Sequence, residues 1–81
     1  MKIARYASAT EITLANGTTV LVSYSTPVAA FVPGKSGALV ADYLQSRTTA
    51  KHVTQFMSRN GLTVRNVVTL ADIAALLPEG V

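Results

Sequence analysis

The chain has 81 residues, of which 49% are hydrophobic and 14% charged, and its formal net charge is +3 at pH 7. It has no cysteine, which excludes disulfides and thiolate metal sites. Because it has only one histidine and four carboxylates, we expect no metal and no cofactor. A chain this short forms one domain, residues 1–81, and buries roughly 60% of its unfolded surface. The apolar composition therefore favours self-association, most simply a homodimer.

The charge is unevenly distributed along the chain. No acidic residue lies between Asp42 and Asp72. The basic residues of that segment are Arg47, Lys51, Arg59 and Arg65. No targeting signal is recognisable, and no apolar run reaches the ~20 residues of a membrane span. We therefore expect a cytoplasmic protein without a membrane partner.

The first half of the chain predicts antiparallel β-structure. Two β-rich runs in "ATEITLANGTTVLVSYS" (residues 9–25) are joined by Asn16-Gly17, which accept the positive φ of a type I′ turn. A two-residue loop would place Thr13 opposite Val20. Glu11 would then share a face of the hairpin with Val20.

Three further strands are expected. "PVAAFV" (27–32) starts with a proline, as suits a strand start or an edge, and "PGKSG" (33–37) is a turn. "ALVADYL" (38–44) predicts a fourth strand, with a short helix as the alternative. "LTVRNVV" (62–68) predicts a fifth strand or an extended connector.

The clearest helix spans "SRTTAKHVTQFMSRNG" (46–61). Ser46 or Thr48 can cap its first turn, and Asn60-Gly61 ends it. The periodicity predicts an inner side that carries Ala50, Val53, Phe56 and Met57. The opposite side carries Arg47, Lys51, Gln55 and Arg59.

A second helix follows near the end of the chain. Thr69 caps "LADIAALL" (70–77), Asp72 stands where a capping box places an acidic or amide side chain, and Pro78 and Gly80 stop the helix. The fold class is therefore α+β: an antiparallel β-meander of four to five strands, with an Asn-Gly hairpin at its start and two short α-helices in the C-terminal half.

Two segments, "VSYSTPVAAFVPGKSG" (22–37) and "SRTTAKHVTQF" (46–56), resemble a small domain of uncharacterised function from bacteriophage proteins and prophage regions. That family has a Tyr-x-Thr-Pro-Val-Ala strand and a Ser-x-Thr-Thr-x-x-His helix start. The matching positions are Tyr24, Thr26, Pro27, Val28, Ala29, Ser46, Thr48, Thr49 and His52. The resemblance covers about half the chain and leaves out its last twenty residues. It implies a phage origin and no particular activity.

The basic side of the first helix is the first candidate site. Arg47, Lys51 and Arg59, with Gln55 and Arg65, could contact phosphates or an acidic partner surface. The alternative is an ordinary solvated helix face, because three charges over three turns are a weak footprint and few aromatic residues accompany them.

The helix start, Ser46, Thr48, Thr49 and His52, is the second candidate. Free N–H groups, hydroxyls and an imidazole could form an anion pocket. Alternatively these groups satisfy one another, since Thr48 lies one turn before His52. Catalysis is not expected, because the chain shows neither a framed nucleophilic serine nor a paired acid and base.

Val20, Val22 and Tyr24 form the third candidate, a face for a partner or a second copy. The alternative is a two-sided core in which Ile73, Leu76 and Leu77 of the second helix cover that face. The shortness of the helix favours a partner surface.

These features predict a non-enzymatic, phage-type binding protein of the host cytoplasm. It would engage a host protein, a defence component or an anionic ligand. The alternatives are a nucleic-acid-binding accessory protein that uses the same basic side, and a structural component of the virion.

Overall fold

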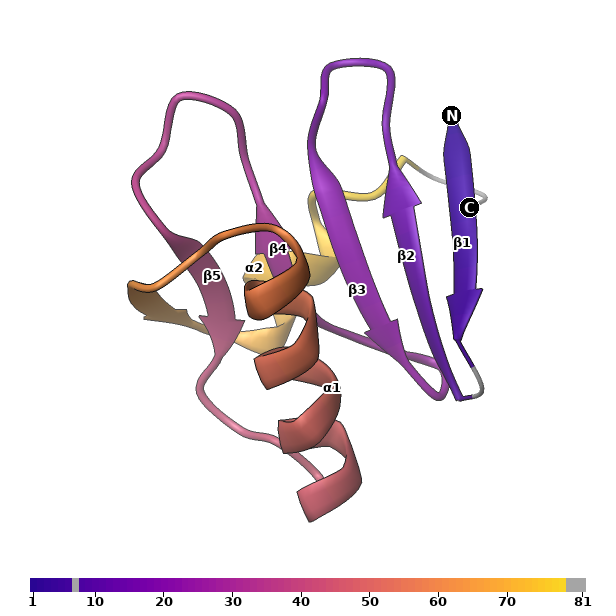
Figure 1. Ribbon diagram of the computed structural model, residues 1–81, viewed down its shortest axis with the longest axis vertical. Coiled ribbons are helices and arrows are strands. Elements are labelled where there is room, and N and C mark those ends of the chain that lie inside the picture. Colours follow the sequence, from indigo (N-terminus) through magenta and orange to yellow (C-terminus); the bar gives the residue numbers. More distant parts are fainter. Residues whose placement is uncertain (7, 79–81) are drawn as a thin grey trace.

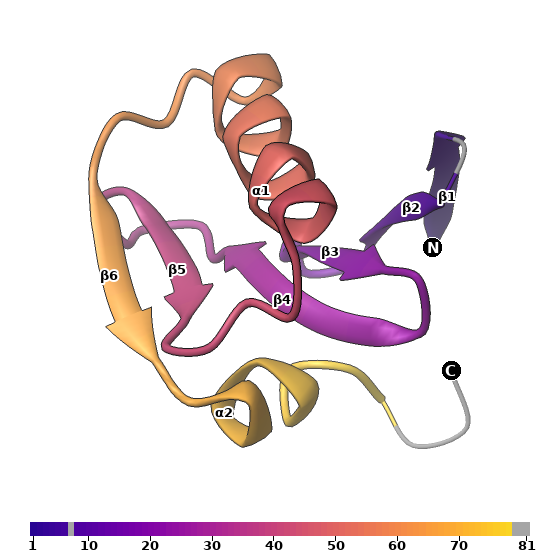
Figure 2. The ribbon, with the colours of Figure 1, turned by 90° about the horizontal axis from the view of Figure 1, so that it is seen from below.

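A six-stranded sheet with one helix on each face forms the protein in a computed structural model, which describes residues 1–6 and 8–78 (Figures 1 and 2). The strands are β1 (Lys2–Tyr6), β2 (Ala9–Thr13), β3 (Thr19–Ser23), β4 (Thr26–Phe31), β5 (Ala38–Ala41) and β6 (Arg65–Val68). The helices are α1 (Arg47–Arg59) and α2 (Leu70–Ala74). The α+β class with two helices in the C-terminal half is confirmed, and the sheet has one strand more than predicted.

The strands lie in chain order, and each pairs antiparallel with the next except β5 and β6, which are parallel. The expected all-antiparallel meander is therefore wrong at this edge. The reason is that α1 connects β5 to β6, and such a crossover returns the chain to the end at which β5 began. At the opposite edge, β1 was not predicted, because Lys2 and Arg5 interrupt its short apolar run.

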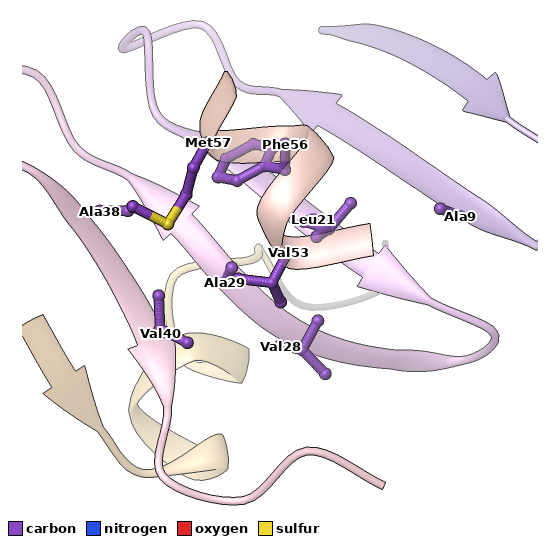
Figure 3. Close-up of a cluster of buried hydrophobic side chains, with 9 residues drawn as sticks. All are labelled: Ala9, Leu21, Val28, Ala29, Ala38, Val40, Val53, Phe56 and Met57. Carbon is purple, nitrogen blue, oxygen red and sulfur yellow. The ribbon is translucent and has the colours of Figure 1, made fainter. Parts of the chain in front are cut away.

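Helix α1 has the expected caps and inner side. Ser46 is the N-cap, its side chain accepts a hydrogen bond from the Thr49 N–H (3.2 Å), and Asn60 is the C-cap. The buried residues of α1 are Thr49, Val53, Phe56 and Met57. The last three pack on Leu21, Val28, Ala29, Ala38 and Val40 of the sheet (Figure 3). Ala50, expected on the inner side, is only half-buried.

Helix α2 covers the other face. Its capping box is present: the Thr69 hydroxyl accepts from the Asp72 N–H, and the Asp72 carboxylate accepts from the Thr69 N–H, both at 3.1 Å. Ile73 is fully buried against Val20, Ala30 and Ala41. The helix is shorter than predicted, but Leu76 and Leu77 continue the same cluster. The expected stop at Gly80 lies outside the described residues.

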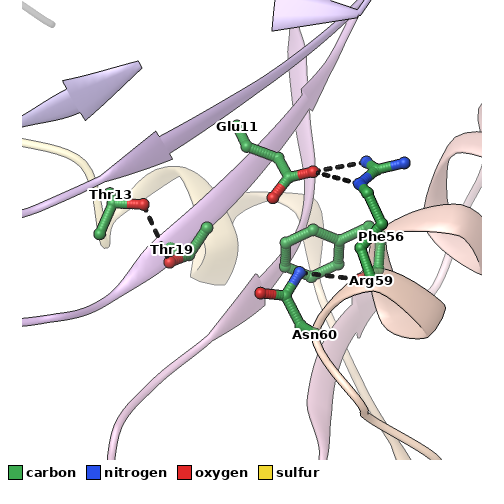
Figure 4. A network of polar contacts seen from close by, with 6 residues as sticks. All are labelled: Glu11, Thr13, Thr19, Phe56, Arg59 and Asn60. Atoms are coloured by element: carbon green, nitrogen blue, oxygen red, sulfur yellow. Dashed lines mark hydrogen bonds and ion pairs between the residues drawn. The ribbon is translucent and has the colours of Figure 1, made fainter. Parts of the chain in front are cut away.

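The first hairpin differs from its prediction by one residue. Thr13 lies opposite Thr19 rather than Val20, and their hydroxyls are 3.2 Å apart (Figure 4). The Gly17 N–H donates to the Leu14 carbonyl (2.9 Å), and of the loop residues only Gly17 has positive φ, at 88°. This is the geometry of a three-residue loop, a type I turn with a glycine bulge. A one-residue shift reverses the faces of a strand, and Glu11 therefore lies on the side of α1.

Candidate functional site

Residues 22–37 and 46–56 meet at the start of α1. Ser23, the last residue of β3, places its Oγ 2.8 Å from Nδ1 of His52 and 3.1 Å from Oγ1 of Thr49. Ser46 donates to that Thr49 hydroxyl (3.3 Å), and the hydroxyl of Ser8 lies 3.5 Å from Nε2 of His52. One chain of hydroxyls and one imidazole thus connects the turn before β2, the end of β3 and the first two turns of α1.

A consistent direction can be assigned to this chain of hydrogen bonds. Because Ser46 donates to Thr49, Thr49 is free to donate to Ser23, and Ser23 to donate to Nδ1 of His52. Nε2 then carries the hydrogen that points to Ser8. Ser23 and Thr49 are 0% and 1% exposed, and among the described residues every buried polar side-chain atom has a partner. Satisfied buried networks of this kind fix local geometry.

Thr48 does not take the place expected for it. It is exposed, whereas its neighbour Thr49 points inward and connects to Ser23. The polar groups at the helix start thus satisfy one another, as the alternative interpretation expected. They do so through Thr49 and Ser23 rather than through Thr48 and His52. The contact could not be foreseen, because 29 residues separate Ser23 from His52.

Tyr24 occupies a strained position beside this network. It lies in the loop between β3 and β4, not on a strand face, with φ at 57°, where a tyrosine backbone costs roughly 1–2 kcal/mol. The Tyr24 N–H donates to the Ser8 carbonyl (2.7 Å), and its ring centroid is 6.0 Å from that of His52. Its side chain is 57% exposed. The loop therefore presents an aromatic ring at the surface next to the start of α1.

A second contact lies beside this network. The Gln45 side-chain amide donates to the hydroxyl of Thr26 at 3.3 Å. This bond connects the loop before α1 to the start of β4.

The basic side of α1 is only partly as predicted. Arg47, Lys51 and Gln55 are exposed, and Arg65 at the start of β6 brings its Nη2 within 3.5 Å of the Thr54 hydroxyl on α1. We call the surface formed by Arg47, Lys51, Gln55 and Arg65 the outer face of α1.

Arg59 does not belong to this outer face. Its Nε donates to a carboxylate oxygen of Glu11 (2.9 Å), and its Nη2 forms an ion pair with the same oxygen (Figure 4). Its guanidinium lies 4.3 Å from the ring centroid of Tyr6. Residues four apart are displaced by about 40° around a helix, so Arg59 lies about 120° around the axis from Arg47. The row of basic residues therefore turns toward the sheet, where the hairpin register has placed Glu11.

The prediction that Val20 belongs to a partner-binding face of the sheet is wrong. That side chain is fully buried beneath α2, and Val22 is half-buried beside Leu76 and Leu77. The alternative of a two-sided core, in which the C-terminal helix covers the face, is the arrangement found.

Within residues 1–6 and 8–78, no group of three or more histidine and acidic side chains could hold a metal ion. In the same part of the chain, no helix has the length and apolar character needed to cross a membrane.

Comparison with known proteins assigns a family without an activity. No curated protein and no solved structure gives a significant match. The model of one family of unknown function, DUF8033, matches residues 1–74, which extends well beyond the two resembling segments and includes β6 and α2. The chain belongs to this family of unknown function.

Proposed function

We propose that this protein is a non-enzymatic, phage-type binding protein that engages an acidic surface of a host protein in the cytoplasm of an infected bacterium. The contact surface is the outer face of α1. The observation that carries the proposal is the state of its cations: Arg47, Lys51 and Arg65 have no acidic partner among the described residues, whereas Arg59 is neutralised by Glu11. Clustered charges without internal partners attract an oppositely charged surface and accelerate association.

The start of α1 extends this surface. Apart from the Thr49 N–H, which Ser46 caps, the backbone N–H groups of the first helical turn carry a partial positive charge that favours a carboxylate or another anion. Exposed Thr48 and the exposed ring of Tyr24 lie nearby. Aromatic residues at the centre of an interface often contribute much of its binding energy.

The surroundings of His52 support binding rather than catalysis. Both ring nitrogens face serine hydroxyls, and one of these, Ser23, is fully buried and closed to a substrate. No carboxylate among the described residues bonds to the imidazole, so the orienting acid of a nucleophilic triad has no counterpart there. In this proposal His52 holds the loop of Tyr24 against α1.

Nucleic acid is the second candidate, because the same three cations could contact phosphates. Binding dominated by phosphates weakens steeply with salt, in proportion to the number of contacts. Three cations and the exposed ring of Tyr24 favour a protein partner, unless a homodimer doubles the outer face. A structural role in the virion is the third candidate. Detection of the protein in purified particles would favour this role over the other two candidates.

The test is affinity capture from bacterial lysate with the double variant Arg47→Gln/Lys51→Gln. The matched control is Lys35→Glu, which changes the charge by the same two units in the exposed β4–β5 loop. We expect a protein partner that the wild type and the control retain after nuclease treatment and that the outer-face variant loses. Equal capture by both variants would contradict the proposal. Loss of all bound material on nuclease treatment would favour the nucleic-acid candidate.

A further inference from the structure

The face of the sheet under α2 is covered unevenly. Helix α2 lies beneath β4 and β5, whereas β1 and β2 lie at the other end of the sheet (Figure 2). A groove of about 320 Å³ remains there. Its apolar lining comes from Ile3, Ile12, Val22, Pro27 and Leu77.

One cation lies in this groove. Among the described residues, Arg5 is the only charged one that lines the groove, and it has no ion-pair partner there. In contrast to the outer face of α1, which is polar, the groove joins an apolar floor to one guanidinium. That combination suits a ligand with an apolar group and a carboxylate a short distance apart.

The groove opens at the free edge of the sheet. Within residues 1–6 and 8–78, β1 pairs only with β2, so on its other side the backbone N–H and C=O groups have no strand partner in that part of the chain. The strand contains two cations, Lys2 and Arg5, and no acidic residue. The nearest carboxylate across the strand pair, Glu11, is already paired with Arg59.

We propose that the edge of β1 binds an extended acidic segment of a partner protein, which joins the sheet as an additional strand. Alternate residues of a strand share a face, so Ile3 and Arg5 together define a spacing. The segment places an apolar side chain over the groove beside Ile3, and a carboxylate two residues away beside Arg5. An open groove encloses a small amphiphile poorly, whereas an added strand gains main-chain hydrogen bonds along the edge.

This interaction is separate from the proposed function, because the groove lies on the opposite side of the sheet from α1. A short acetylated peptide with the sequence Thr-Thr-Leu-Thr-Glu-Thr is titrated into the isotope-labelled full chain, and binding is followed by NMR. We expect shifts at β1, Val22 and Leu77, with none at Lys51. N-methylation of the peptide amides that face β1 should abolish binding, because it removes the main-chain donors.

Arg5→Gln should weaken this peptide about twofold to fivefold, as expected for a partly exposed ion pair. The matched variant Lys35→Gln, which removes a cation from the β4–β5 loop, should have no effect. Equal binding of the N-methylated peptide would overturn the proposal. So would shifts confined to α1, an absence of peptide binding, or a groove that takes decanoate but not the peptide.

Discussion

Replacing His52 by alanine tests the role of the hydroxyl chain. The change removes the acceptor of the 2.8 Å bond from fully buried Ser23 and the ring beside Tyr24. The lost hydrogen bond and packing cost about 1.5 kcal/mol, and the better helix propensity of alanine returns about 0.5 kcal/mol. The net loss is therefore about 1 kcal/mol, which lowers the Tm of a domain this size by about 4–8 °C.

The assay is thermal unfolding followed by circular dichroism, with His52→Asn as the informative second variant. The asparagine oxygen can take the place of Nδ1 and accept from Ser23, so His52→Asn should unfold at a higher temperature than His52→Ala, despite its poorer helix propensity. Gln55→Ala, on the outer face of the same helix, is the control and should leave the Tm unchanged. An unchanged Tm for His52→Ala together with lost partner capture would refute the structural role and make His52 a binding residue.

Two further predictions concern the fold. In urea unfolding, Gly37→Ala should destabilise the protein by about 2 kcal/mol more than Gly34→Ala. Both glycines have positive φ (79° and 86°), but only at Gly37 would a Cβ lie 2.5 Å from the Val64 carbonyl oxygen. Equal losses would show that β5 and β6 do not depend on this close approach. Glu11→Gln should lower the free energy of unfolding by about 1 kcal/mol, because it weakens the contact with partly exposed Arg59. The control, Asp42→Asn, changes an exposed carboxylate and should be neutral in the same assay. Identical stabilities of the two variants would mean that the ion pair does not stabilise the fold.

The helices could be predicted because their signals are local. Ser46 and Asn60 mark the two ends of α1, and Thr69 with Asp72 forms a capping box within one turn. The spacing of Val53, Phe56 and Met57 was enough to identify the inner side of α1. These features depend only on neighbours in the sequence, and the structure confirms them.

Sheet register and strand direction depend on more distant choices. Asn16-Gly17 fits both a two-residue and a three-residue loop, and the choice between them decides which side of the sheet receives Glu11. The parallel pairing of β5 and β6 follows from α1 serving as a crossover. The length of the connection could have indicated this, since antiparallel neighbours need only a short loop.

The candidate site was predicted in composition but not in arrangement. Sequence spacing brought Ser46, Thr49 and His52 together on one helix, but it could not reveal their contacts with Ser23 and Ser8. Helix spacing alone assigned Arg59 to the basic side. Its partner Glu11 could not be recognised, because it lies 48 residues away in the sequence. The strained loop of Tyr24 has no local sequence signal, because glycine or asparagine is the usual residue at such a φ.

The central claim is that the outer face of α1 is the contact surface. Site-specific photo-crosslinking in bacterial cells that produce the protein tests this claim most directly. A photoreactive phenylalanine analogue replaces Gln55, which is exposed and neutral, and in a parallel protein it replaces exposed Ser36 in the β4–β5 loop. We expect a crosslinked partner protein from position 55 and none from position 36. Crosslinking from position 36 alone, or from neither position, would contradict the assignment of the contact surface to the outer face of α1.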